Sequence, residues 1–595
     1  MKRLLFISFL FSISLFTKAQ DLNYTKAGFD NNQVIGLDQF GRTFNAISGC
    51  KPKKQIGLFF WPWIGQPYIK DIYDVTKISK LANGLKLLYD FKYQNDSVSL
   101  KGQFHFWGEP IWGYYNSDDE WVIRRQIKML TMAGVDFIVF DVTNYVTYKD
   151  VYIKVLNIIN DYITQGWNPP KVAFYTHSYS FNTTRNLYAD LYEPELFPKT
   201  WYRVGGKPMI IAYTNIADDI AEAKSRNDIT YNPAPYSNKI KNFFYFKKPQ
   251  WPFDPVYQDG FPWIEWIYPQ PLHGNTMSVT VASHPKVPMS RSITSGWENW
   301  GRGWDPIKKK NDKDKVDKGG FFQWEWDNAL KMNPDTIFIG GWNEWIALKQ
   351  PYGDEFMLCD AADKEFSRDI EPMKGGYEDA FYIQMIQNIR KYKGIKYPGS
   401  ATQSKIININ KGNEQWGKVD AVYRNIDTNT YERNSYGAAK TVKYFQKKPL
   451  NNLQEIRVTH DYANFYFYIR CGENIVRQAG ENNLMNLFLG IGDPTLKGWS
   501  GYEYVIGRNY QNDKVSIGKL NADYSDKKMG KGEFSLSGNV MQFKIPRKLL
   551  HAGNDCSQIY FKIADGVENP SDIMNYYVTG SVMPLGRLSY LYKLK

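Results

Sequence analysis

The sequence contains little cysteine and little histidine. It has four cysteines (Cys50, Cys359, Cys471 and Cys556) and six histidines among 595 residues. Four widely spaced cysteines form neither a disulfide framework nor a zinc-ligand motif, and no His-x-x-x-His or paired Asp/His spacing suggests a catalytic metal. We therefore expect no cofactor. Pairing of Cys471 with Cys556 stays open, as does calcium bound by scattered carboxylates and carbonyls.

Several enzyme motifs are also missing. No Gly-rich phosphate loop follows an early strand, which argues against phosphoryl transfer and against a doubly wound sheet. There is no Gly-x-Ser-x-Gly elbow, so serine-hydrolase chemistry is not expected. The net charge of +13 is spread thinly, and Lys308–Lys310 begins a mixed segment typical of a solvated loop. Without an RNA- or DNA-binding motif we expect no nucleic-acid partner, whereas an acidic polysaccharide remains compatible with the charge.

The only apolar run near membrane-spanning length is at the amino terminus. Met1–Arg3 is positively charged, Leu4–Phe16 is apolar, and Thr17–Gln20 offers a cleavage region. This pattern predicts a signal peptide over residues 1–20, and the run is short for a transmembrane helix. No cysteine follows closely, so a lipid anchor is not indicated. We expect an exported protein, periplasmic or extracellular, without a transmembrane segment.

Aromatic residues, by contrast, are abundant. They make up 16% of the sequence, and hydrophobic residues as a whole make up 43%. A chain of this length and composition builds a full core and two or three domains. The aromatic excess is typical of carbohydrate-active proteins, although aromatic-rich cores also produce it.

Residues 21–398 alternate strand and helix patterns. Buried strands are predicted at 56–61, 135–140, 172–175, 208–212, 278–282 and 336–340. Helices are predicted at about 118–134 and 149–165, the first of them ended by Gly134. Most of these strands end in polar or aromatic residues. The pattern predicts a (β/α)8 TIM barrel whose reactive residues lie at the carboxyl ends of the strands.

Beyond a boundary near Lys393–Gln403 the pattern changes. Residues 404–595 contain short alternating strands, among them 455–460, 465–469, 486–490 and 540–545, separated by turn residues. This predicts an all-β sandwich domain. Trp499 and Tyr502 could form a glycan-binding face on it, or could pack between its sheets.

The most informative segment is Ile337–Trp345, in which an apolar run and two glycines precede Trp-Asn-Glu-Trp. At a barrel strand end, Glu344 could exchange a proton or stabilise positive charge at an anomeric carbon. The indoles of Trp342 and Trp345 could stack on sugar rings. The alternative is a buried glutamate held by Asn343 and by indole N–H groups. The polar and aromatic composition favours a carbohydrate site.

Two upstream segments accompany this motif: His105–Glu109, with the sequence His-Phe-Trp-Gly-Glu, and Phe140–Asn144, with the sequence Phe-Asp-Val-Thr-Asn. Together the three resemble the barrels of glycoside hydrolase families 99 and 71, which include endo-α-mannosidases and the WbsX-like proteins of polysaccharide loci. The resemblance covers roughly residues 56–394 and implies a glycan substrate. The last domain is similar to family 9 carbohydrate-binding modules through its strand order and its Gly501–Tyr504 strand.

The resemblance also implies a pair of catalytic carboxylates. In family 99 a Glu follows Asn in this motif, and a second catalytic Glu lies three residues later. Glu344 matches the first, but Ala347 occupies the second position and cannot transfer a proton. Either another loop provides the second acid, or the chemistry differs, or catalysis is lost. Asp141, at the end of a buried strand, and Glu298, flanked by aromatics, are the candidates.

Other strand-end residues are expected to bind the sugar. They are polar or aromatic side chains at or near the predicted strand ends: His105, Trp107, Glu109, Asn144, His177, Tyr179, Tyr213, Glu265, Trp342, Asn343 and Trp345. Glu109 and Glu265 are further candidates for the second acid. For His105 and His177, packing in the core is the alternative.

These observations predict a secreted glycoside hydrolase acting on a polysaccharide or complex glycan through Glu344 and a second carboxylate. Two alternatives stay open. The first is a non-catalytic glycan-binding protein on a hydrolase scaffold, suggested by Ala347. The second is a polysaccharide lyase, which the positive charge permits. The sequence does not define an oligomeric state.

Overall fold

The computed structural model describes residues 34–45, 47, 49–289, 299–395, 401–428, 431–477 and 484–595. The predicted signal peptide and Glu298 lie outside the described residues. Within these ranges, no helix combines the length and the apolar character needed to cross a membrane.

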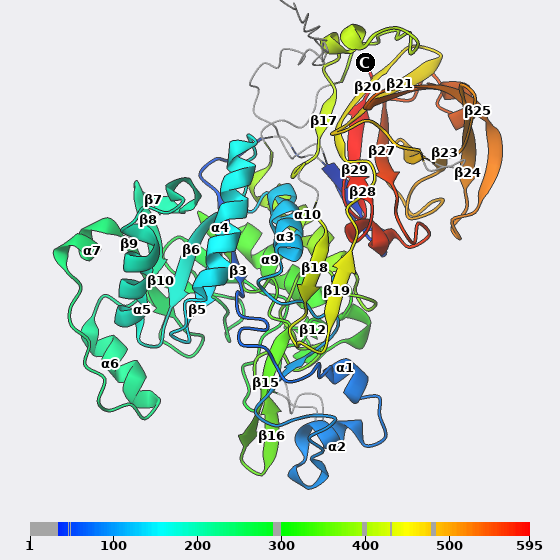
Figure 1. The fold of residues 1–595 in the computed structure, drawn as a ribbon. Helices are drawn as coiled ribbons and strands as arrows, with labels where there is room; N and C mark the ends of the chain where they lie inside the picture. Colours follow the sequence, from blue (N-terminus) through cyan, green and yellow to red (C-terminus); the bar gives the residue numbers. More distant parts are fainter. Residues whose placement is uncertain are drawn as a thin grey trace, which may run out of the picture.

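Eight parallel strands form a nearly closed barrel, which confirms the predicted fold (Figure 1). Their order in space follows their order in the chain: β3 (Gln55–Phe60), β5 (Phe137–Val142), β6 (Lys171–Thr176), β8 (Lys207–Ile211), β9 (Tyr245–Gln250), β10 (Gly260–Pro262), β11 (Thr276–Val279) and β14 (Thr336–Ile339). Strand β14 pairs with both β11 and β3, so the chain returns to its first barrel strand. The short strand β7 (Arg203–Val204) pairs with β8.

Helices connect most of these strands. They are α3 (Glu120–Ala133), α4 (Lys149–Thr164), α5 (Ser180–Leu187), α6 (Ile216–Ser225), α7 (Asn238–Phe243), α9 (Gly320–Met332) and α10 (Ala380–Lys393). Helix α3 begins where the Asp119 carboxylate accepts two backbone N–H groups and ends at Gly134, whose φ is +80°. A left-handed residue of this kind favours glycine. The predicted helices at 118–134 and 149–165 are confirmed, with shifts of one or two residues at their ends.

Side-chain alternation along the barrel strands separates two cores. Phe59, Val139, Tyr175, Ile211 and Phe338 belong to one buried cluster, which fills the barrel interior. The residues between them on the strands belong to the larger cluster that also contains the helices. Because the period of a strand is two residues, the inward row continues toward the mouth of the barrel.

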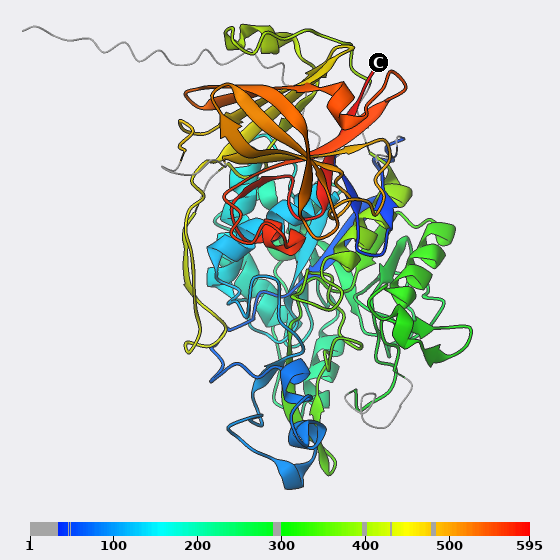
Figure 2. The same cartoon turned by 90° about the vertical axis from the view of Figure 1, so that its right-hand side faces the viewer.

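A small group of helices and strands, here called the excursion, extends beyond the carboxyl ends of the barrel strands. It contains α1 (Val75–Ile78), α2 (Gly84–Tyr89), β4 (Phe104–Phe106), β15 (Ile346–Tyr352) and β16 (Glu355–Leu358). Strand β15 begins two residues after Glu344 and pairs with β4 and β16. Figures 1 and 2 show this excursion at one end of the molecule and the C-terminal sheet at the other.

The C-terminal region is all-β, as predicted. Its strands form one antiparallel sheet that curls around a common core (Figure 1). They are β17 (Val422–Arg424), β20 (Leu453–His460), β21 (Asn464–Cys471), β22 (Met485–Ile491), β23 (Tyr504–Gln511), β24 (Lys514–Leu520), β25 (Asp526–Ser537), β26 (Val540–Pro546), β27 (Gln558–Asp565), β28 (Ser581–Met583) and β29 (Leu588–Lys593), with β1 (Val34–Leu37) and β2 (Thr43–Phe44). Strand β1 pairs with β29, so residues 34–44 belong to this sheet although they precede the barrel in the chain.

The structure answers two questions that the sequence left open about side chains of this region. Trp499 and Tyr502 are buried, so they pack in the core of the sheet and form no exposed glycan-binding face. Cys471 and Cys556 are both free thiols.

Buried polar contacts join the two regions. The hairpin of β18 (Arg433–Tyr436) and β19 (Lys443–Gln446) leaves the C-terminal region and lies along the barrel (Figure 2). Its Arg433 donates to Asp119, the residue that caps α3, over 2.7 Å. At a second point Asp379, before α10, accepts from Arg587 at 2.9 Å and from Tyr577 at 2.8 Å. Asp379 is fully buried.

Replacing Arg587 by leucine should destabilise the protein, because it leaves the Asp379 carboxylate buried without its cation. Loss of one partner of a buried ion pair costs about 3 kcal/mol or more, so we expect Tm to fall by about 5 °C or more in a thermal melt.

The matched control is Lys149→Met, which removes the surface pair with Asp190, whose side chains are 49% and 39% exposed. Its Tm should stay within about 1 °C of the wild type. An Arg587→Leu variant as stable as the control would contradict the importance of the buried pair.

Candidate active site

The inward row of the barrel strands ends in a ring of polar and aromatic side chains. Asp141 follows Val139 on β5, His177 follows Tyr175 beyond β6, and Tyr213 follows Ile211 beyond β8. The His177 ring lies 4.3 Å from the Trp251 ring and 5.6 Å from the Tyr213 ring. Trp251 contacts Trp263 at 5.2 Å. Side chains from neighbouring strands therefore meet at the carboxyl end of the barrel, as the fold requires.

Glu344 lies at this end and is 5% exposed. Its Oε2 accepts a hydrogen bond from the Arg368 guanidinium at 2.7 Å, and its backbone N–H donates to Asp369. Burial raises the pKa of Glu344 well above its usual range, and nearby carboxylates, Asp141 among them, raise it further, while Arg368 opposes the rise. Burial of this kind favours the protonated form of a carboxyl group over the charged form.

Asp141 is the second carboxylate of the site. It is 7% exposed and accepts hydrogen bonds from the Trp63 indole at 2.9 Å and the Thr143 N–H at 3.0 Å. Burial raises the pKa of Asp141, and these two hydrogen bonds limit the rise because they favour the charged form. Asp141 is one of the carboxylates whose charge raises the pKa of Glu344, so the two groups interact electrostatically.

Arg368 connects the carboxylates of this site. Its guanidinium also pairs with Asp360 at 3.3 Å and lies 4.8 Å from the Trp263 ring. Glu344 and Asp360 therefore share one guanidinium, and the charge of Asp369 also acts on it. Negative groups exceed positive ones, and retention of a proton on a carboxyl relieves the repulsion.

Two buried donors at the mouth are available to a ligand. Arg368 Nε and Trp263 Nε1 have no hydrogen-bond acceptor within the described part of the chain. Buried donors are normally paired, and a ligand oxygen could satisfy them. A sugar hydroxyl or ring oxygen has the required chemistry.

The segment that carries Arg368 was not singled out as catalytic from the sequence. It follows the β15–β16 hairpin and returns to the end of β14, where Ile370 and Glu371 donate backbone N–H groups to the Trp342 carbonyl. A Cβ at Gly341 would lie 2.5 Å from the Arg368 carbonyl, so this close approach requires glycine. The two glycines before Trp342 were the sequence feature that could have indicated this close backbone contact.

The indoles of Trp107, Trp342 and Trp345 do not face a ligand. All three are fully buried, so the expected stacking on sugar is replaced by packing. Trp107 and Trp345 stack on each other at 4.4 Å. The Trp107 indole donates to Asp369 at 2.8 Å, which in turn holds the Glu344 backbone. These side chains pack against the segment that carries Glu344.

The side chains of Asn343 and His105 likewise form hydrogen bonds with other parts of the protein. The Asn343 amide accepts from the Trp61 N–H at 2.9 Å and donates to the Trp61 carbonyl at 3.1 Å, tying β14 to β3. Both ring nitrogens of His105 are bonded within the protein, one to Ser99 and one to a backbone carbonyl. Burial lowers the pKa of His105 to about 3. His105 is therefore packed in the core, which was the alternative to sugar binding given for it from the sequence.

Four further predicted residues lie outside the carboxylate cluster. Glu109 is paired with Lys77 and Lys374, and Asn144 is exposed and bonded to Tyr148. Tyr179 donates to Asp228, and Glu265 is buried against His273 at 2.7 Å.

Ala347, at the position of the second acid in family 99, lies on β15 opposite His105. No carboxylate replaces it there.

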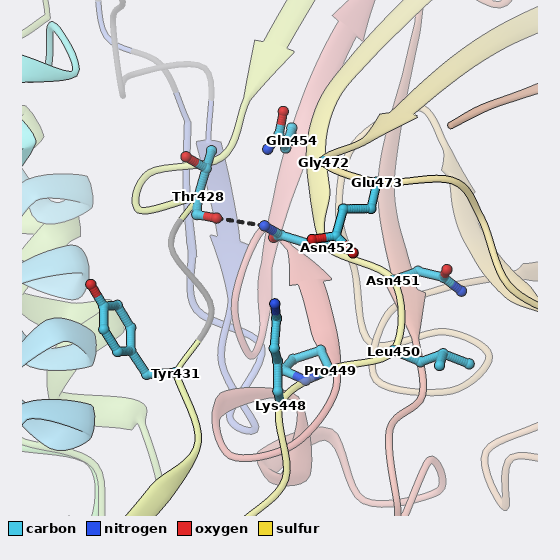
Figure 3. Close-up of a pocket in the computed structure, with 10 residues that line it drawn as sticks. All are labelled: Thr428, Tyr431, Lys448, Pro449, Leu450, Asn451, Asn452, Gln454, Gly472 and Glu473. Carbon is cyan, nitrogen blue, oxygen red and sulfur yellow. Dashed lines mark hydrogen bonds between the residues drawn. The ribbon is translucent and has the colours of Figure 1, made fainter. Parts of the chain in front are cut away.

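Among the described residues, no group of three or more His, Cys, Asp and Glu side chains could hold a metal ion. A separate polar hollow of about 380 Å³ lies beside β20 and β21 (Figure 3). Its residues include Asn452, which donates to the Thr428 carbonyl, and a single carboxylate, Glu473. Because it lacks a second carboxyl group, this hollow does not match the predicted chemistry.

No family model and no curated protein matches the chain. The chain is similar to two solved structures of the family 99 endo-α-mannosidase from Bacteroides thetaiotaomicron, one of them in complex with bis-tris-propane. The identities are 14% for the complex and 16% for the other structure, and both have a TM-score of 0.31. Each match covers 57% of this chain and 97% of the other. The functional argument rests on the side chains at the barrel mouth.

Trp107→Ala should destabilise the protein, because it opens a cavity beneath Glu344 and removes the stack with Trp345. The expected cost is about 3–5 kcal/mol, measured as a fall in Tm. Phe253→Ala, at a side chain that is 68% exposed, is the matched aromatic control and should leave Tm nearly unchanged. A stable Trp107→Ala variant that binds glycans less tightly would restore the sugar-stacking role.

Proposed function

We propose that the protein is a glycoside hydrolase that cleaves a polysaccharide or complex glycan with Glu344 and Asp141. The observation that carries the proposal is that two buried carboxyl groups with raised pKa values, Glu344 and Asp141, interact electrostatically at the carboxyl end of a TIM barrel. Hydrolysis of a glycosidic bond requires one carboxylic acid and one carboxylate on either side of the scissile bond.

The roles follow from the surroundings of each group. Glu344, with its pKa raised well above the usual range, acts as the general acid and protonates the leaving oxygen. Asp141 accepts two hydrogen bonds that favour its charged form, so it acts as the carboxylate that attacks the anomeric carbon or activates water. Arg368 fixes the Glu344 carboxyl through one oxygen and leaves the other for proton transfer.

Aromatic side chains at the mouth of the barrel form the sugar-binding surface in this proposal. Trp63 donates to Asp141 and Trp263 lies against Arg368, while Trp251 and Tyr213 lie beside His177 at the same end of the barrel. Together with the unpaired donors of Arg368 and Trp263, they suit a ligand with apolar ring faces and oxygen acceptors. The chemistry needs no cofactor, because side chains perform both proton transfers. The amino-terminal sequence supports export, so we propose a periplasmic or extracellular site of action.

A glycan-binding protein without turnover is the second candidate. The Glu344–Arg368 ion pair favours it, because a carboxylate held at 2.7 Å by a guanidinium is stabilised in its charged form. This candidate predicts tight binding and no release of reducing ends.

Glu344→Gln and Asp141→Asn should each lower kcat/KM by about 100-fold or more, since each removes a proton-transfer or attacking group and preserves shape. Release of reducing ends from a polysaccharide panel by the mature chain is the measurement. Binding of the same glycans is read in parallel.

Glu193→Gln is the control, because its exposed carboxylate pairs only with the surface residue Lys239 within the described contacts. Its activity should match the wild type. Full activity of Glu344→Gln would remove Glu344 from the mechanism, and binding without release in every variant would favour the glycan-binding candidate.

The pH dependence tests the role of Arg368. Activity should fall on the alkaline side as Glu344 loses its proton. The Arg368 charge lowers the pKa of Glu344, so Arg368→Met should raise that pKa and shift the alkaline limb of kcat/KM upward by about one pH unit.

Arg368→Lys keeps the charge and should keep the limb near its wild-type position. An alkaline limb that Arg368→Met leaves unchanged would show that the limb belongs to another group.

A further inference from the structure

A second hollow lies on the C-terminal sheet, apart from the barrel. It has a volume of about 700 Å³, within the range of small-molecule sites. The turn between β20 and β21 forms one side, and the segment that follows β26 forms the other. The residues that line it are Tyr462, Ala463, Asn464, Pro546, Arg547, Lys548, His551, Ala552, Gly553 and Asn554.

Tyr462 is the most exposed of the large hydrophobic side chains in the described chain, at 86%. Its position is fixed by the preceding residue, because the Asp461 carboxylate accepts the Ala463 N–H at 2.7 Å, the Asn464 N–H at 2.6 Å and the Tyr466 hydroxyl at 2.7 Å. The ring is therefore held in solvent on a rigid turn. Within the described residues, no ring contact or hydrogen bond of the Tyr462 side chain accounts for this exposure.

The charge of the hollow has one sign. Its lining contains Arg547, Lys548 and His551 and neither aspartate nor glutamate. Arg547 is 6% exposed, donates to the Asp461 and Gly553 carbonyls, and has no acceptor for its Nε within the described residues. Two of the five N–H donors of the Arg547 guanidinium are thus bonded to backbone oxygens, and its buried Nε–H has no acceptor within the described residues. The Asp461 carboxylate is fully occupied by the turn.

We infer that this hollow binds an acidic sugar unit of a polysaccharide. The ring of a hexuronate would stack on Tyr462, and its carboxylate would meet Arg547, Lys548 and His551. The Asn464 and Asn554 amides would accept and donate hydrogen bonds to hydroxyls. The site adds an acidic ligand class and a second binding position to the proposed hydrolase, and its existence does not depend on catalysis at Glu344.

The experiment compares polygalacturonate with its methyl-esterified form, which keeps the backbone and removes the charge. Binding of the full mature chain is measured by isothermal titration calorimetry in the Glu344→Gln background, so that hydrolysis does not interfere. We expect polygalacturonate to bind at least about tenfold more tightly than the ester, and Tyr462→Ala and Lys548→Gln each to weaken it by about tenfold or more. Raising the salt concentration should weaken it as well.

The controls remove matched groups elsewhere. Phe445→Ala removes an aromatic side chain that is 58% exposed, and Lys528→Gln removes an exposed charge on β25 of the same sheet. His551→Asn tests the contribution of the imidazole, since asparagine tolerates the φ of +51° at that position. Both controls should bind within about twofold of the parent, and His551→Asn should bind more weakly.

Equal affinity for polygalacturonate and its ester would overturn the inference, as would a Tyr462→Ala variant within twofold of its parent. The absence of measurable binding to polygalacturonate, alginate and chondroitin sulfate would overturn it too. Because the readout is binding at a site outside the barrel, each of these failures leaves the hydrolase proposal standing. Conversely, intact polygalacturonate binding without any release of reducing ends would leave this inference standing and contradict the hydrolase proposal.

Discussion

The site depends on one buried guanidinium shared by two carboxylates. Arg368 is fully buried, pairs with Glu344 at 2.7 Å and with Asp360 at 3.3 Å, and lies against the Trp263 ring. A lone buried cation would be costly, and so would two adjacent carboxylates. Together they tolerate burial and leave Glu344 with a raised pKa. Arg368 orients the Glu344 carboxyl, while burial, as the largest cause, and the charges of Asp360, Asp369 and Asp141 raise its pKa.

The rest of the molecule serves to hold this arrangement in place. The two-residue period of the barrel strands directs Asp141, His177 and Tyr213 to the mouth over a packed aromatic interior. Beneath Glu344, the stacked Trp107 and Trp345 indoles and the Asp369 carboxylate form a rigid base. Fully packed interiors transmit small displacements, so a shift of this base would also move Glu344, whose backbone Asp369 holds.

Much of the fold and part of the site could be predicted from the sequence, because their signals come from residues that are close together in the chain. Strand runs, the Asp119 cap and Gly134 are short-range signals, and Asp141 and Glu344 follow directly from strand ends. Arg368 could not be found in this way, because it reaches Glu344 from a segment 24 residues later that makes no regular element. Sequence composition also could not separate indoles that pack from indoles that face solvent. Trp342 and Trp345 flank Glu344 in the chain and are fully buried, whereas Trp63 and Trp251, which follow β3 and β9, are only partly buried. The pairing of β1 with β29 joins the two ends of the described chain and has no local signal at all.

The central claim is that water cleaves a glycosidic bond at the barrel mouth. Digestion of a glycan panel in oxygen-18 water, followed by mass spectrometry of the products, tests it most directly. The account predicts fragments that carry one oxygen-18 atom at the new reducing end in the wild-type digest and are absent from the Glu344→Gln digest. Unlabelled fragments that contain a new carbon–carbon double bond, or labelled fragments that persist when Glu344 is replaced, would contradict it.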